Sequence, residues 1–248
     1  MLKVQNLGVY YRGIAALQGV SFTIEPGQLV GLIGPNGAGK STMVKAMLGL
    51  IPAASGVVTF NQSPLKGQLQ QVAYVPQRSQ IDWDYPVTAW NVVMMARTIH
   101  AGWLSGFSRQ SQELVNDALQ RVGLWELRHR QIGELSGGQQ QRVFLARAIA
   151  QQAQLFLFDE PLTGIDKKTE AIIFEVFSEL KAEGKTLLMS SHEWGDALTH
   201  YDRLLLLNQH LVADGLPQEV MTLENIRRAY GEGVQRSSIK AAETLYFC

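Results

Sequence analysis

The feature that most constrains the fold is the glycine-rich segment GPNGAGKS at 34–41. It follows a short apolar run at 28–34, QLVGLIG, and leads into a helical pattern from Lys40 to about Leu50. Glycines let a loop wrap closely enough for backbone N–H groups to face phosphate oxygens, and the following helix adds the positive end of its dipole. Because every fixed position of G-x-x-x-x-G-K-[ST] is filled, the segment predicts a strand, a phosphate-binding loop and a helix.

This loop predicts how a nucleotide is held. Lys40 is expected to meet the β- and γ-phosphates, and the Ser41 hydroxyl is expected to bind Mg²⁺. An ordinary glycine-rich turn before a helix is the alternative, which the strand before the loop and the helix after it disfavour. The residues predicted to surround the phosphates are Gly34, Pro35, Asn36, Gly37, Ala38, Gly39, Lys40, Ser41 and Thr42.

Charge and composition narrow the choice of partners. Lys plus Arg and Asp plus Glu each total 22, so the formal net charge is zero and nucleic acid is not an expected partner. The one cysteine, Cys248, excludes an intrachain disulfide framework. No apolar stretch approaches the roughly 20 residues of a membrane-spanning helix, and the N-terminus lacks the pattern of a secretory signal. We therefore expect a cytoplasmic protein.

The order of patterns along the chain predicts an α/β fold. Residues 2–24 favour short antiparallel strands, and further strands are expected at 56–60, 71–75, 153–158, 186–190 and 203–208. Several of these are continuously apolar, as in a parallel sheet that is buried on both faces. Residues 87–127 are mostly helical, with a break at AGWLSGFSR that predicts a loop, and they favour an inserted helical subdomain. The tail at 231–248 is polar and ends in ETLYFC, which is either native or an expression remnant, so no functional residue is expected there.

A second chemical signal is LFLFDEP at 155–161, an apolar strand that ends in two carboxylates. In open parallel sheets ligands lie beyond the carboxyl ends of the strands, so Asp159 and Glu160 should lie beside the phosphate loop. Asp159 can hold the Mg²⁺ shell, and Glu160 can polarise the water that attacks the γ-phosphate. Alone, the pair would be a solvated turn more often than a site, but the upstream loop reverses that judgement.

The third signal, LSGGQ at 135–139, identifies a family. Ser136 suits a helix N-cap, and the residues after it favour a helix whose start could attract an anion. Placed before LFLFDEP, the segment resembles the signature sequence of the ABC ATPases, so a P-loop NTPase (RecA-like) core with an antiparallel β subdomain is expected. The signature residues matched are Leu135, Ser136, Gly137, Gly138 and Gln139.

Four single residues match the same family. Tyr11 resembles the aromatic residue that stacks on adenine, with Tyr10 as the second candidate. Gln77 resembles the glutamine that joins the Mg²⁺ and water shell and senses the membrane partner. Asp166 resembles the aspartate that couples two ATP sites, and His192 resembles the histidine that contacts the γ-phosphate. Any one of these residues alone would be a routine one, but their order and spacing together resemble this family.

The resemblance covers residues 2 to about 220 and implies one ATPase domain at 1–230. Its core is expected at about 1–86 and 144–220, with the helical subdomain at about 87–143. ATP is the implied substrate, with Mg²⁺ as its metal, and two subunits are implied to pair head to tail around two nucleotides. The phosphate loop of one subunit and the signature of the other would then enclose a shared ATP.

A narrower resemblance concerns the transported ion. The segment PQRSQIDWDYPVTAWNVVMMAR at 76–97 looks like the ATPases of manganese, zinc and iron uptake systems. This implies an integral membrane permease, a metal-binding extracytoplasmic protein and a location on the cytoplasmic face of the membrane. Asp82, Trp83, Asp84 and Tyr85 fall where such proteins receive the permease, although they could equally be filling of the helical subdomain. Manganese is the first choice, followed by zinc and ferrous iron.

Three alternatives differ in class. A soluble ABC ATPase of translation or DNA repair usually has tandem cassettes or a long coiled-coil insertion, and neither is present here. An exporter subunit is disfavoured because exporters often fuse the cassette to a membrane domain. A regulatory module that binds nucleotide without turnover is disfavoured by the presence of Glu160 and His192.

Overall fold

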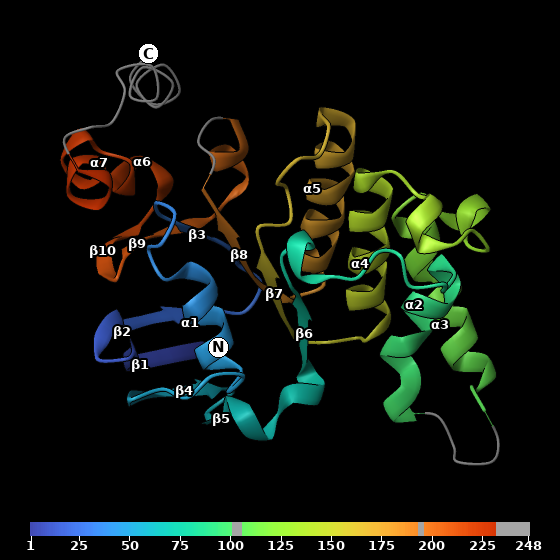
Figure 1. The fold of residues 1–248 in the computed structure, drawn as a ribbon, viewed down its shortest axis with the longest axis horizontal. Helices are drawn as coiled ribbons and strands as arrows, with labels where there is room; N and C mark the ends of the chain where they lie inside the picture. Colours follow the sequence, from blue (N-terminus) through green and yellow to red (C-terminus); the bar gives the residue numbers. More distant parts are fainter. Residues whose placement is uncertain (101–105, 193–195, 232–248) are drawn as a thin grey trace.

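The computed structural model describes residues 1–100, 106–192 and 196–231. Within these residues the chain forms ten β-strands in two sheets and seven α-helices. Most of the segment 101–109, where a loop was expected, and nearly all of the tail at 231–248 lie outside the described residues. Figure 1 shows the two sheets on one side of the molecule and helices α2 to α5 on the other.

The central sheet has six strands, and all but one neighbouring pair run parallel. Its strand order is β10-β9-β3-β8-β7-β6, with only β10 antiparallel to its neighbour. Strands β3 and β7 are buried along their whole length, which explains their continuous apolar sequences. The bounds are β3 Leu29–Ile33, β6 Val72–Val75, β7 Leu155–Asp159, β8 Thr186–Ser191, β9 Arg203–Asn208 and β10 His210–Gly215.

The two faces of this sheet build two hydrophobic cores. Alternation along β7 sends Leu155 and Leu157 to one core and Phe156 and Phe158 to the other. The first core also contains helix α1, Lys40–Met47, and the N-terminal sheet. The second contains helix α5, Lys167–Ala182, the helical subdomain and the short C-terminal helices α6, Pro217–Val220, and α7, Leu223–Tyr230.

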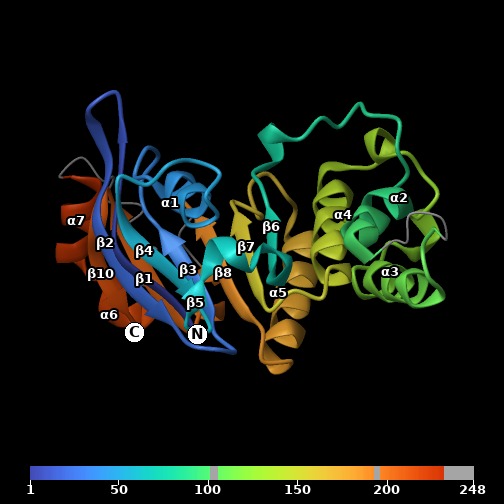
Figure 2. The same cartoon turned by 90° about the horizontal axis from the view of Figure 1, so that it is seen from below.

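The N-terminal residues form a separate antiparallel sheet of four strands in the order β2-β1-β4-β5. Its strands are β1 Leu2–Tyr11, β2 Ile14–Ile24, β4 Ser55–Phe60 and β5 Ser63–Pro64. Figure 2 shows this sheet beside α1 and the central sheet. The predicted core with an antiparallel β subdomain is therefore confirmed. Strands β5 and β10 were not predicted, because β5 has only two residues, one of them proline, and β10 ends in Asp and Gly.

The helical subdomain contains α2 Ala89–Met94, α3 Arg109–Arg121 and α4 Gly137–Ala150. Thr88, Ser108 and Ser136 cap these helices, each accepting a hydrogen bond from a backbone N–H of the first turn. Helix α4 continues past the expected boundary at residue 143, and it packs against α2 and α3 as well as against β6 and α5. One helix thus packs against both the subdomain and the core.

Candidate functional site

The glycine-rich loop is held in place by close backbone contacts. A Cβ on Gly34 would lie 2.1 Å from the Leu207 carbonyl oxygen, and one on Gly39 would lie 2.7 Å from the Ala16 carbonyl oxygen. Gly39 also has a φ of 96° immediately before α1, a conformation that side chains rarely adopt. The loop is therefore wedged between β9 and β2, which explains two of its glycines by packing rather than by ligand binding alone.

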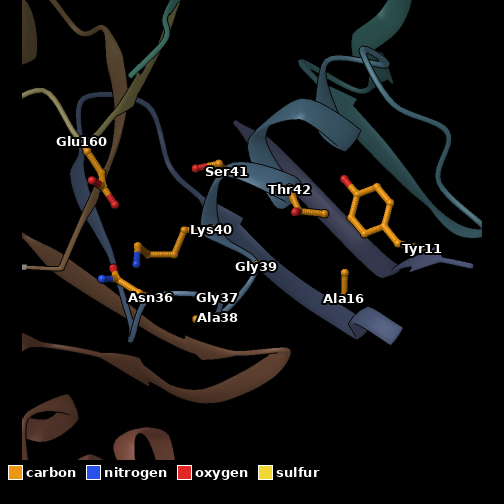
Figure 3. Close-up of a pocket in the computed structure, with 10 residues that line it drawn as sticks. All are labelled: Tyr11, Ala16, Asn36, Gly37, Ala38, Gly39, Lys40, Ser41, Thr42 and Glu160. Carbon is orange, nitrogen blue, oxygen red and sulfur yellow. The ribbon is translucent and has the colours of Figure 1, made fainter. Parts of the chain in front are cut away.

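The loop forms the floor of a pocket of about 310 Å³. Tyr11 lies at its rim with half of the residue exposed, whereas Tyr10 is not among the lining residues, so the structure favours Tyr11 over Tyr10 as the aromatic neighbour of a ligand. Figure 3 shows these side chains around the start of α1. The residues that line the pocket are Tyr11, Ala16, Asn36, Gly37, Ala38, Gly39, Lys40, Ser41, Thr42 and Glu160.

Lys40 brings a cation into this pocket. Only 5% of the residue is exposed, and its Nζ donates to the carbonyl oxygens of Gly34 at 2.8 Å and Pro35 at 3.1 Å. Burial lowers the pKa of Lys40, and the nearby carboxylates of Glu160 and Asp159 oppose that shift. The ammonium is therefore poorly hydrated, which makes an anionic ligand a favourable additional partner.

Asp159 lies opposite Ser41 across the end of the sheet. Ser41 Oγ donates to Asp159 Oδ1 at 2.9 Å, and Ser190 Oγ donates to the same oxygen at 2.7 Å. Asp159 is 1% exposed, and its other oxygen, Oδ2, has no hydrogen-bond partner within the described part of the chain. A buried carboxylate oxygen without a partner is costly, and such hard oxygen donors suit Mg²⁺.

Glu160 is held by residues from three separate loops. Its Oε2 accepts a hydrogen bond from Gln77 Nε2 at 3.0 Å and lies 3.3 Å from His192 Nδ1 and 3.5 Å from Thr163 Oγ1. The residue has a φ of 50°, an uncommon conformation for a side chain with a Cβ, which points to a constrained position. Figure 3 shows Glu160 and Lys40 extending toward the same space. A carboxylate fixed in this way can orient and polarise a water molecule.

The segment 135–139 does not line this pocket. Ser136 begins α4 with a reciprocal cap, because its Oγ accepts from the Gln139 backbone N–H at 3.3 Å while Gln139 Oε1 accepts from the Ser136 N–H at 2.9 Å. Leu135 is buried in the core, and Gly138 lies so close to Thr169 that a Cβ would be 2.6 Å from its Oγ1. The first turn of α4 therefore lies outside the pocket above the glycine-rich loop.

Asp166 has a local structural task. It is the N-cap of α5, and it accepts hydrogen bonds from the Thr169 N–H at 2.9 Å and from Thr169 Oγ1 at 3.0 Å. These hydrogen bonds lower the pKa of Asp166. Thr169 in turn contacts Gly138, so the loop that carries Asp166 is tied to the start of α4 within one chain.

Several contributing residues escaped the sequence reasoning. Ser190 bonds to Asp159 and also accepts the Glu160 backbone N–H at 3.0 Å, and the rule that ligands gather at the carboxyl ends of parallel strands could have found it. Ala16 lines the pocket from β2, and Thr163 contacts Glu160 from three residues further along the same loop; neither carried a local signal. Arg78 follows Gln77 directly, but only the fold shows that it contacts α4.

Comparison with known proteins shows to which family the chain belongs. Residues 17–163 match the family model described as ABC transporter. The chain belongs to the ABC transporter family. As an ATP-binding cassette of that family it is an ATPase whose hydrolysis of ATP is coupled to transport, and such cassettes act as dimers in complexes with membrane permeases. No helix in the described residues of this ABC transporter subunit is long and apolar enough to span a membrane.

Several of its relatives are ATP-binding proteins of metal transport systems. The chain is 45% identical over 230 residues to the manganese transport system ATP-binding protein MntB of Halalkalibacterium halodurans, covering 93% of this chain and 92% of that protein. It is 44% identical to the zinc transport system ATP-binding protein TroB of Treponema pallidum, covering 93% and 86% of the two chains.

Solved structures show the same fold. An inward-facing conformation of a putative metal-chelate type ABC transporter has a TM-score of 0.81 and 27% identity, covering 92% of this chain and 88% of that one. The dimeric structure of MJ0796, a bacterial ABC transporter cassette, has a TM-score of 0.77 and 26% identity, covering 88% and 99%. A further structure of MJ0796, with a TM-score of 0.76, holds ADP and phosphate.

Proposed function

We propose that this chain is the ATP-hydrolysing subunit of an importer for a divalent transition metal, with manganese as the first candidate and zinc and ferrous iron next. The observation that carries the proposal is the identity of 45% to a manganese system and 44% to a zinc system, each over 93% of this chain. Transport proteins of one architecture share the ATP site, so the choice among the metals rests on these relatives and not on the site.

The pocket above the glycine-rich loop is the proposed ATP site. Tyr11 stacks on the adenine ring, and the backbone N–H groups of Gly37 to Thr42 donate hydrogen bonds to the phosphate oxygens at the positive end of α1. Lys40 turns from the loop carbonyls toward the β- and γ-phosphates, because a charge-assisted bond to phosphate is stronger than its bonds to neutral carbonyls.

Ser41, Asp159 and Gln77 are the proposed holders of Mg²⁺. The partnerless Oδ2 of Asp159 and the hydroxyl of Ser41 fit this ion, and Gln77 reaches the same region through Glu160. When bound, Mg²⁺ neutralises charge that develops on the phosphates during hydrolysis. Ser190 keeps the Asp159 carboxylate in its orientation through the bond to Oδ1.

Glu160 is the proposed catalytic carboxylate. Gln77 donates a hydrogen bond to its Oε2, and its Oε1 is proposed to orient the attacking water and to accept its proton. His192 is then placed to contact the γ-phosphate. Because phosphoryl transfer depends mainly on positioning and charge stabilisation, this fixed carboxylate is expected to matter more for turnover than for binding.

The signature residues 135–139 are proposed to cover ATP that is bound by a second copy of the chain. Their absence from the lining of their own pocket and the helix N-terminus that they form support this proposal. Asp166 is proposed to couple the two ATP sites of such a homodimer. The exposed residues Asp82, Asp84 and Tyr85 are the proposed contact with the membrane permease, on the cytoplasmic face of the membrane.

Reconstitution tests the whole proposal. The chain is assembled in vesicles with its cognate permease and metal-binding extracytoplasmic protein, and uptake of radioactive Mn²⁺ is measured with unlabelled Mn²⁺, Zn²⁺ or Fe²⁺ as competitors. ATP-dependent uptake that Mn²⁺ suppresses at the lowest concentration is expected, and Glu160→Gln in the same complex serves as the inactive control. Uptake of another solute class, or efflux, would contradict the proposed function.

A further inference from the structure

Arg78 connects the loop after β6 to the helix that carries Ser136. Its Nη2 donates to Gln140 Oε1 at 2.8 Å, and Gln140 Nε2 donates to the Ile132 carbonyl at 3.0 Å. Gln140 is only 4% exposed, so its amide has a fixed orientation and a buried acceptor that depends on Arg78. An exposed arginine thus completes a hydrogen-bond chain that continues into the segment leading to α4.

Trp83 fixes the arginine from the other side. Trp83 Nε1 donates to the Arg78 carbonyl at 3.0 Å, and the guanidinium lies 5.6 Å from the centre of the Trp83 ring. The Trp83 ring itself packs edge-on against Phe144 of α4 at 5.3 Å. The loop after β6 therefore contacts α4 through the side chains of Arg78 and Trp83.

The guanidinium also lies directly against the first residue of α4. A Cβ on Gly137 would be 3.1 Å from the guanidinium carbon and from both of its terminal nitrogens. A cation beside the positive end of a helix is electrostatically unfavourable. The contact is therefore not explained as stabilisation of the helix, and a local rule broken beside a functional segment points to a role in that function.

Gln77, the residue before Arg78, contacts Glu160. Gln77 Nε2 donates to Glu160 Oε2 at 3.0 Å, so two consecutive residues hold Glu160 on one side and α4 on the other. A short loop cannot move one of these contacts far without disturbing the other. The position of the Ser136 turn is thus linked mechanically to the loop that organises Glu160.

We propose that Arg78 is a positioning residue, which holds the Ser136 end of α4 in the orientation that closes on ATP bound by a second copy of this chain. The inference rests on the proposed head-to-tail dimer and adds a residue to it that acts through α4. Without Arg78, α4 samples other orientations, and only the competent fraction can pair.

The test measures ATP-dependent dimerisation in a Glu160→Gln parent, by light scattering over a series of protein concentrations with ATP and Mg²⁺. Adding Arg78→Ala is expected to weaken dimerisation about tenfold, the loss that matches one hydrogen bond to a charged group. ADP affinity of the monomer should stay unchanged, and the loss of one partner of the buried Gln140 should lower the melting temperature no more than Gln140→Ala does. Arg109→Ala, which removes the same charge from an exposed pair with Glu113, is the matched control and should dimerise like the parent.

Two further variants separate positioning from simple charge. Arg78→Lys keeps the charge but loses the planar fork, so it should restore dimerisation only in part. Arg78→Ala should add no further loss in a Gln140→Ala background, because both remove one interaction.

The inference is overturned, and the dimer is not, if Arg78→Lys dimerises as well as the parent. The same holds if Arg78→Ala dimerises as well as the parent. A parallel fall in ADP affinity, or a melting temperature of Arg78→Ala below that of Gln140→Ala, would also overturn it. If the Glu160→Gln parent itself stays monomeric with ATP, the proposed dimer is wrong and the role of Arg78 falls with it.

Discussion

Ser190 holds Asp159 across the gap between two neighbouring strands, with its Oγ donating to Asp159 Oδ1 at 2.7 Å. The same hydroxyl accepts the Glu160 backbone N–H at 3.0 Å, so one buried serine fixes both carboxylate residues at the end of β7. Strand β8 makes this possible, because it lies between the phosphate-loop strand β3 and β7.

Ser190→Ala should therefore impair both stability and metal use. The loss of two buried hydrogen bonds is expected to cost about 1–3 kcal/mol in the free energy of unfolding. The Mg²⁺ concentration for half-maximal ATPase activity should also rise, because Asp159 loses its orientation. Urea unfolding and Mg²⁺ titrations measure the two effects. Ser111→Ala is the control, because this buried serine of α3 bonds only to Ser108 among the contacts described. In that variant the free energy of unfolding should fall while the Mg²⁺ requirement stays the same.

Glu160→Gln should abolish turnover while ATP binding is retained. The amide has the same shape but cannot accept a proton, so ATPase activity is expected to fall by about 10²–10⁴-fold. Steady-state phosphate release and a direct ATP titration measure the two effects separately. Turnover at the parent rate would remove Glu160 from its proposed role.

Lys40→Ala should weaken ATP binding by about 10- to 100-fold, since the phosphates lose a charge-assisted partner. Titration with a fluorescent ATP analogue measures the affinity. Thr42→Ala, a change two residues further along the same turn of α1 that leaves the ammonium in place, should cost much less. Equal affinities of Lys40→Ala and the parent would exclude the loop as the phosphate site.

The lowered pKa of Lys40 also predicts a pH dependence of ATP affinity. Only the protonated amine attracts phosphate, so affinity is complete well below this pKa and falls as the pH rises through it. Because burial lowers the pKa, the fall should begin at a lower pH than an ordinary lysine would show. Titrations from about pH 7 to about pH 10 should slope downward for the parent and stay flatter for Lys40→Ala.

Gly34→Ala should destabilise the fold without any ligand present. The added Cβ would lie 2.1 Å from the Leu207 carbonyl oxygen, and relief of that clash is expected to cost at least about 1–3 kcal/mol. Gly67→Ala is the matched control, since a Cβ there meets nothing within 4 Å. Denaturant unfolding of the apo proteins compares them, and equal stability of the two variants would contradict the packing explanation.

The sequence by itself determined the features that depend on patterns of consecutive residues. A strand, loop and helix at 28–50 and a buried strand that ends in Asp159 and Glu160 are local patterns, since period, glycine placement and strand-end carboxylates need no distant partner. The order of these patterns also determined the family, which the match at 17–163 confirms. The fold class followed for the same reason.

Tertiary structure alone decided which residues meet. Tyr10 and Tyr11 are adjacent and similarly exposed, and only the packing of the β1–β2 hairpin beside the loop brings Tyr11 to the pocket. Ser190 reaches Asp159 because β8 inserts between β3 and β7, which follows from the order of strands in space and not from the chain. The contact of Arg78 with Gln140 likewise depends on how α4 packs against the loop after β6, because contacts between distant segments are set by the shared core.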